Sequence, residues 1–404
     1  MLMLLRRHAD LRRLAAAGLV SLSGDYLLFV GLSYLVYDLT GSTVAAGGAL
    51  LANFAPQVVV GSFAGVFVDR WDRRRTMVVS DLLQAVGLLP LLFAGPGRIG
   101  VVYAVLLWQG TVEQFFHPAQ QALVPALVPA EDLLAANAVT GQSQHLARLA
   151  GSALGGVVAA WGGIAAVAAA DAATFVVSAA LLSRIAARTA PDRGAPPVER
   201  ALRRVTAEWR AGMRMVGRSR GLRVVLAFGL LTGVGEGVLV TLLAPWVRDV
   251  VHGDGKAYGL LVGLQAIGGV AGAALVAPVG RRVPAARLFG WGGVGLGLLD
   301  LALLGYPAAY PHVLPAFALI VVAGLPAALC YTGYVTVVQT LTDDAYRGRV
   351  MGSFMAARGL AMLAGIGIAA AFGEVVGVLP LVLVQGVVYV AGGALVLLAR
   401  IDGT

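Results

Sequence analysis

Three carboxylic acids, Asp25, Glu113 and Glu236, stand within long apolar runs of this sequence. A charged side chain inside a membrane-crossing helix costs about 2.5 to 3.5 kcal/mol on insertion scales, and such residues usually face a cavity or a partner. A carboxyl group taken out of water can bind and release a proton near neutral pH. The pattern predicts proton-coupling sites at these positions. A hydrogen-bonded structural carboxylate is the alternative for each, and Glu236 also suits substrate contact.

Two arginines, Arg148 and Arg358, also fall inside apolar runs. Because an unpaired buried charge is costly, we expect one of them to provide the counter-charge for Glu113. His117, one helical turn after Glu113, is interpreted as a helix-end or packing residue.

Aromatic and amide side chains in the apolar runs are candidates to line a site for a bulky, partly apolar substrate. Such residues more often pack between helices or form interfacial belts. Gln57 and Trp246 are favoured because each follows a proline, and an interrupted helix exposes backbone carbonyls to a cavity. The predicted cavity residues are Gln57, Trp108, Gln109, Arg148, Trp246, Tyr331 and Arg358.

Composition places the chain in a lipid bilayer. Of its 404 residues 59% are hydrophobic and 13% charged, with a mean hydropathy of +0.83, against about 45 to 50% apolar and 25% charged in soluble domains. Runs long enough to cross about 30 Å of hydrocarbon recur throughout. We predict an all-α membrane protein with twelve transmembrane helices in two six-helix bundles. The spans are 14–37, 44–68, 76–95, 99–122, 138–161, 164–186, 224–249, 257–279, 285–306, 312–339, 350–373 and 378–399.

The predicted domains are an N-terminal six-helix bundle at 1–187, a cytoplasmic linker with an amphipathic helix at 188–223, and a C-terminal six-helix bundle at 224–404. Lys and Arg gather in the termini, the linker and alternate loops. By the positive-inside rule this places both termini in the cytoplasm and the chain in the inner (cytoplasmic) membrane. The net charge of +9 is therefore a topology signal rather than a sign of nucleic-acid binding.

An internal repeat supports two related halves. When the sequence is shifted by about 211 positions, Gly24-Asp25 meets Gly235-Glu236, and Arg70 meets Arg281 without a gap. Parallel repeats of this kind are related by an axis along the membrane normal, which favours a substrate path between the halves.

A charged loop, GVFVDRWDRRR at residues 65–75, separates the second and third spans. It resembles the G-x-x-x-D-R-x-G-R-R motif of the major facilitator superfamily, with Asp72 where that pattern has glycine. The resemblance implies two bundles that open alternately to each side. It also implies a gate motif in which Asp69 meets a helix start in the other half, with Arg70, Arg73 and Arg74 as pairing partners and Gly65 as the first residue of the motif. Asp81 is assigned to the same cytoplasmic network.

Further stretches extend the resemblance over most of the chain. Within the superfamily the sequence is similar to the drug:proton antiporter branch that includes macrolide-efflux proteins and an enterobactin exporter. The segments are SLSGDYLLFVGLSYLVYDLTGS, FHPAQQALVPALVPAEDLLAANAV, GSALGG, DAATFVVSAALL and YRGRVMGSF. Two positions depart from the pattern. Ser152 replaces a proline in the fifth span, where the glycines are interpreted as packing residues, and Leu106 replaces a proton-relay arginine in the fourth.

Enzymatic and cofactor-dependent functions find no support in the sequence. It contains no Walker-type phosphate loop, no metal-ligand cluster and a single cysteine, Cys330. We expect a protein without a cofactor that is not an enzyme. The resemblance and the placement of the acids imply that it exports amphipathic drug-like or antibiotic-like small molecules by proton antiport, and we expect it to be a monomer. The alternatives are siderophore export, lysophospholipid transport and, less favoured, a non-transporting membrane sensor.

Overall fold

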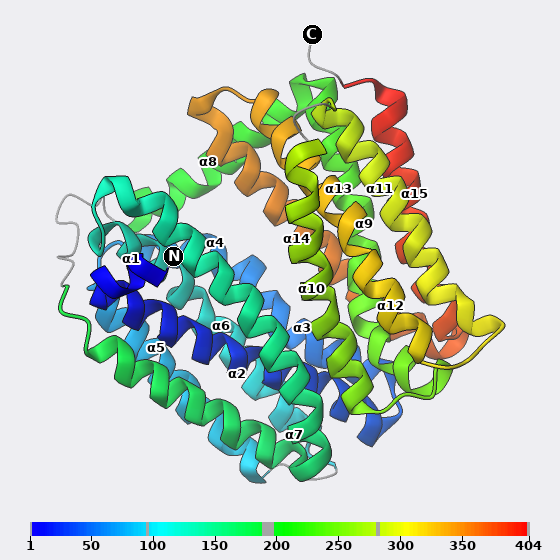
Figure 1. Ribbon diagram of the computed structural model, residues 1–404, viewed down its shortest axis with the longest axis horizontal. Coiled ribbons are helices and arrows are strands. Elements are labelled where there is room, and N and C mark those ends of the chain that lie inside the picture. The colour runs from blue at the N-terminus through cyan, green and yellow to red at the C-terminus, as the bar shows by residue number, and fades with distance from the viewer. Residues whose placement is uncertain (1, 94–96, 188–197, 280–282, 402–404) are drawn as a thin grey trace. The chain divides into compact units, whose positions relative to one another are not determined.

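The computed structural model describes residues 2–93, 97–187, 198–279 and 283–401, which form helices joined by short loops (Figure 1). In this part of the chain no strand occurs, and ten helical segments are long and apolar enough to cross a membrane. A helix satisfies its backbone polar groups internally, as hydrocarbon requires of a spanning segment. The prediction of an all-α membrane protein is confirmed.

The first half of the chain contains the first six predicted spans. Its helices are α1 (Leu2–Arg7), α2 (Ala9–Thr40), α3 (Thr43–Val59), α4 (Gly61–Val68), α5 (Arg73–Leu88), α6 (Ile99–Leu123) and α7 (Leu133–Ser183). Helices α3 and α4 together cover the span predicted at 44–68. Helix α7 covers two spans, because Gly163, with φ of 60° and ψ of −154°, breaks it between 138–161 and 164–186. Glycine adopts such a conformation at little steric cost.

The second half contains the other six spans and the linker helix. Its helices are α8 (Val198–Arg218), α9 (Arg220–Pro245), α10 (Gly255–Val279), α11 (Ala285–Gly305), α12 (Leu314–Val322), α13 (Gly324–Thr340), α14 (Asp344–Val376) and α15 (Val378–Ala399). Helices α12 and α13 divide the span predicted at 312–339. The first part of the linker, 188–197, and the loop 280–282, which holds Arg281 of the repeat, lie outside the described residues.

The chain divides into two compact units. The first comprises Met1–Leu39 and Ala52–Arg203, and the second comprises Thr40–Leu51 and Arg204–Thr404. The beginning of α3 belongs to the second unit, since Glu374 Oε1 accepts hydrogen bonds from Ser42 Oγ at 2.8 Å and from the Thr43 backbone nitrogen at 3.1 Å. The domain boundaries at residues 187 and 223 stay a prediction.

Glycines allow the helices of each unit to approach closely. In the first unit α5 packs on α6 and α7, and in the second α9 packs on α14 and α15 while α11 packs on α13 and α15 (Figure 1). A Cβ atom added at Gly151 of α7 would collide with the Ser23 carbonyl oxygen of α2, and one at Gly237 of α9 with the Met362 carbonyl oxygen of α14. Small residues at such crossings are typical of membrane helix packing. The packing interpretation of GSALGG is confirmed at Gly151.

Candidate functional site

An ion pair joins two predicted site residues of the second unit. Arg358 Nη2 of α14 donates to Glu236 Oε2 of α9, although 122 residues separate them in the chain. The side chains remain 44% and 38% exposed, respectively. The sequence predicts Arg358 or Arg148 as the counter-charge of Glu113. Arg358 instead pairs with Glu236, because α9 and α14 pack together through glycines.

The carboxylate of Glu113 contacts a histidine on its own helix. Its Oε1 lies 3.2 Å from His117 Nε2, one turn further along α6, and the two side chains are 38% and 35% exposed. His117 is therefore a partner of a candidate proton site rather than a packing residue. The spacing of four residues brings side chains together on a helix and was the signal that could have identified it. Arg148 lies over the Tyr26 ring, 6.0 Å from its centroid.

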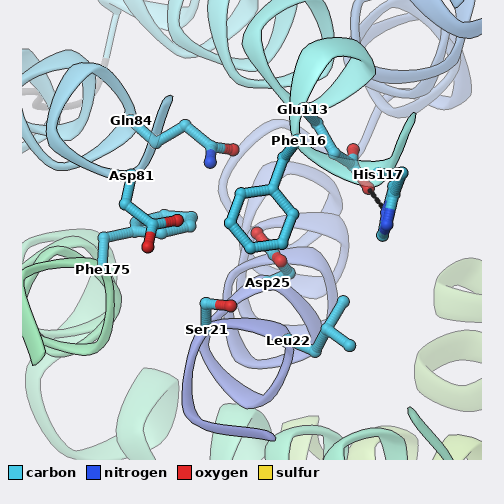
Figure 2. Close-up of a pocket in the computed structure, with 9 residues that line it drawn as sticks. All are labelled: Ser21, Leu22, Asp25, Asp81, Gln84, Glu113, Phe116, His117 and Phe175. Carbon is cyan, nitrogen blue, oxygen red and sulfur yellow. Dashed lines mark hydrogen bonds and ion pairs between the residues drawn. The ribbon is translucent and has the colours of Figure 1, made fainter. Parts of the chain in front are cut away.

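Asp25 lines a small cavity inside the first unit. Figure 2 shows Asp25 from α2, Asp81 from α5 and Glu113 from α6 arranged around the ring of Phe116. The complete lining is Ser21, Leu22, Asp25, Asp81, Gln84, Glu113, Phe116, His117 and Phe175. Two of the three predicted proton sites thus share one cavity, whereas Glu236 belongs to the second unit.

The structure shows two buried acids in the first unit that the sequence did not identify as site residues. Asp81 and Asp171 are both 0% exposed. Sequence reasoning assigned Asp81 to the loop network and did not single out Asp171, which lies in the segment DAATFVVSAALL of α7. Its burial depends on a glycine of α2: a Cβ atom added at Gly24 would collide with Asp171 Oδ1 and Thr174 Oγ1.

The gate motif forms the end of α4 and the start of α5. Asp69 is exposed, and its backbone nitrogen closes the last turn of α4 by donating to Gly65 O. Three arginines donate to carbonyl oxygens near helix ends: Arg70 to Val66 O, Arg73 to Ala122 O at 3.0 Å, and Arg74 to Ile185 O at 2.7 Å. Such ends are the negative poles of helix dipoles. Each of these arginines thus donates at least one hydrogen bond to a carbonyl group near a helix end, and the gating role of Asp69 stays a prediction.

Asp72, the position that departs from the superfamily pattern, has a local role. Its Oδ1 accepts a hydrogen bond from the Arg75 backbone nitrogen at 2.8 Å, so it is the N-cap of α5. N-cap acids satisfy one of the amide groups left unbonded at a helix start. Sequence comparison presented Asp72 as a defect of the motif, whereas the structure shows it as a capping residue.

Several predicted cavity residues hold helices together. Trp246 is 1% exposed and donates through Nε1 to Leu304 O at 3.3 Å, and Gln109 is 5% exposed and donates to Gln84 O at 3.0 Å. Trp108 donates to Leu83 O at 3.0 Å. Only Gln57 and Tyr331 of the uncharged set are exposed without such a bond in the described residues, and Tyr331 is 69% exposed.

The described residues give no indication of a metal site. Among the described residues no group of three or more His, Cys, Asp or Glu side chains is placed to hold a metal ion. Cys330, the single cysteine, is buried.

The fold and sequence match known transporters. A family model described as transmembrane secretion effector matches residues 5–404. The enterobactin exporter of Citrobacter koseri is 28% identical over 395 residues, covering 91% of this chain and 87% of that protein. An uncharacterized MFS-type transporter of Bacillus subtilis is 24% identical, covering 98% and 94%. The crystal structure of a peptide transporter superimposes with a TM-score of 0.74 at 15% identity, covering 98% of this chain and 95% of the other.

Proposed function

Because the chain belongs to the transmembrane secretion effector family of the major facilitator superfamily, we propose that it exports an amphipathic small molecule in exchange for protons. The fold and family establish a multi-pass membrane transporter that is not an enzyme. Proton antiport and the direction of transport are the proposal.

The Glu236–Arg358 ion pair is the observation that carries it. Even buried ion pairs can often be replaced by apolar side chains without loss of stability, and partly exposed pairs contribute little to it, so stability alone does not account for this pair between two spanning helices. Exposed fractions of 38% and 44% leave the pair open to a proton or to a charged substrate group. Glu236 can be neutralised by Arg358, by a proton or by a cationic group. Competition between the last two is the physical basis of exchange.

Transport in proteoliposomes with an imposed pH gradient tests the proposal, with a fluorescent lipophilic cation as the probe. We expect Glu236→Gln to abolish uptake driven by the gradient, because an amide takes up no proton, while exchange of probe between equal pH values persists. Asp300→Asn is the matched control, since Asp300 is a second acid in a span of the same unit and only 6% exposed. Gradient-driven uptake by Glu236→Gln at the wild-type rate would refute coupling at this residue.

A siderophore is the second candidate substrate. The observation that favours it is the 28% identity to an enterobactin exporter over 91% of this chain. Recognition of an anionic siderophore would depend on the positive charge of Arg358 more than on Glu236. In the same proteoliposomes, loss of enterobactin transport in Arg358→Gln together with no transport of the cation would assign this substrate class.

The remaining alternatives give different outcomes in the same assay. A lysophospholipid transporter would move lipid without needing a pH gradient or a water-soluble substrate. A sensor would transport none of the probes. For the exporter we further propose a monomer in the inner membrane with both termini in the cytoplasm, and a gating role for Asp69.

A further inference from the structure

Two carboxyl groups in the interior of the first unit lack the partners that a buried charge requires. Neither oxygen of Asp81 has a hydrogen bond of good geometry within the described chain, where the Ser178 hydroxyl is the one polar group that acts on it, and Oδ2 of Asp171 has no partner either. Both side chains are 0% exposed. Ionised carboxylates in such positions are very unfavourable, and a group there takes up a proton instead. The proposed exchange at Glu236 makes no use of either residue.

These acids gather around Asp25. Three other carboxyl groups lie close enough to Asp25 to interact with it electrostatically: Asp171 of α7, Glu113 of α6 and Asp81 of α5. Asp81 and Asp25 line the same cavity (Figure 2), in which about 10 Å³ is open to the centre of a water molecule. That is about the space one bound water needs, and water requires polar partners of this kind. The cavity is far too small for an amphipathic substrate.

The second half of the repeat shows that the fold does not need an acid at this position. A Cβ atom at Gly24 would collide with Asp171 and Thr174, whereas one at the equivalent Gly235 would approach Gln385 Oε1 and a methyl group of Val388. Asp171 and Gln385 therefore both lie behind equivalent glycines, although the shift of 211 places Asp171 opposite Val382, one helical turn from Gln385. Because an amide fills this space in the second half, with Asp300 as its hydrogen-bonding neighbour, packing against the glycine does not by itself require a carboxyl group.

We propose that Asp25, Asp81 and Asp171 form an internal proton-binding site in the first unit, linked through a single water in the cavity. A proton released from the carboxyl group of Asp81 passes to the water, which gives one of its protons to the Asp25 carboxylate; Asp81 becomes a carboxylate and the water is regenerated. Asp171 shares the bound proton from behind Gly24. The use of this site in transport rests on the proposed function, while its protonation does not.

Other polar groups complete the surroundings of the site. They are Tyr26 of α2, the Glu113–His117 pair of α6, and Arg148, Thr174 and Ser178 of α7. Thr174 Oγ1 donates to the Asp171 backbone oxygen at 2.7 Å and lies 3.2 Å from Asp171 Oδ1, while Oδ2 of Asp171 has no partner within the described chain.

Infrared titration of the full-length protein in detergent, without substrate, tests the proposal, and the probe is the proton itself. We expect a carboxylic-acid C=O absorption at neutral pH that shifts in D₂O. The Asp81→Asn and Asp171→Gln variants should each reduce it, and Asp25→Asn identifies the Asp25 component. In Asp81→Asn and Asp171→Gln the titration midpoint of Asp25 should move by about one pH unit, the size expected when a nearby interacting charge is lost.

Two controls distinguish proton binding by these acids from a purely structural role. Asp171→Gln copies the residue of the other half and should keep the fold, as checked by size-exclusion chromatography and circular dichroism; Asp171→Asn is the second variant if it does not. Asp300→Asn removes a buried acid from the other unit and should leave the Asp25 titration unchanged. An Asp25 titration that is the same in wild type, Asp81→Asn and Asp171→Gln would overturn the proposal, whatever the transport assay shows.

Discussion

The Glu236–Arg358 ion pair can be broken from either side, by Glu236→Gln or Arg358→Gln, and by both changes together. With about 4 Å between charge centres and an effective dielectric constant near 20, the attraction is about 4 kcal/mol. Because 38% of the Glu236 side chain and 44% of the Arg358 side chain are exposed, solvent screening reduces this value. Fully exposed ion pairs contribute about 0.2 to 1 kcal/mol. The Glu236–Arg358 pair lies between this value and the unscreened attraction, so we expect a coupling free energy of about 1 to 2 kcal/mol.

A double-mutant cycle measures this energy. The purified protein is unfolded at equilibrium in mixed micelles by raising the fraction of a denaturing detergent. Each single variant should lose stability, and the double variant should lose about 1 to 2 kcal/mol less than the sum of the two, because the second change removes a charge already left without its partner. Glu236→Gln combined with Asp300→Asn is the control cycle, since no ion pair joins these two acids.

Additive effects would contradict the reasoning. The loss of stability in the double variant could equal the sum of the losses in the two single variants to within about 0.3 to 0.5 kcal/mol, as it does for independent sites. In that case the two charges would not stabilise one another. The pair would then be a contact without energetic weight, and competition for Glu236 would lose its physical basis.

Three further changes test individual features of the fold. Asp72→Ala removes the N-cap of α5 and should lower the free energy of unfolding by about 1 kcal/mol in the same micelle titration. Gly237→Ala places a Cβ atom against Met362 O and should prevent recovery of folded protein by size-exclusion chromatography, whereas Gly229→Ala, with open space around it, should be recovered normally. Asp69→Ala should impair transport while membrane insertion, measured by protein abundance in membranes, stays at the wild-type level; equal transport would support a plain positive-inside anchor.

The spans could be predicted because hydropathy and helix breaks are local properties. Each predicted span has a helical counterpart in the described residues, and the break between the fifth and sixth falls at Gly163, where the backbone takes a conformation suited to glycine. The capping role of Asp72 was also local. Its place before a helix start was visible in the sequence, but the motif comparison directed attention to the missing glycine instead.

The pairing of charges could not be predicted, because it depends on which helices cross. Glu236 and Arg358 are 122 residues apart and meet only because α9 and α14 pack together. Likewise, the sequence shows Asp171 only as a polar residue in an apolar helix, and its packing against Gly24 of another helix is visible only in the structure. Trp246 illustrates the opposite error, since a proline before it suggested an open cavity while the indole lies buried against Leu304.

The two halves of the repeat keep the same helix crossing but differ in chemistry. Behind its glycine the first half places Asp171, next to Asp25 and Asp81, while the second half places Gln385 and neutralises Glu236 with Arg358. A pair of opposite charges is stable without a proton, whereas three neighbouring carboxyl groups are not. On this argument the first half is the part of the transporter that must hold a proton, and the second half is the part where a charged substrate and a proton compete for one carboxylate. An exporter built this way would lose proton binding through changes at Asp171 and lose exchange through changes at Glu236, and the two assays above separate these defects.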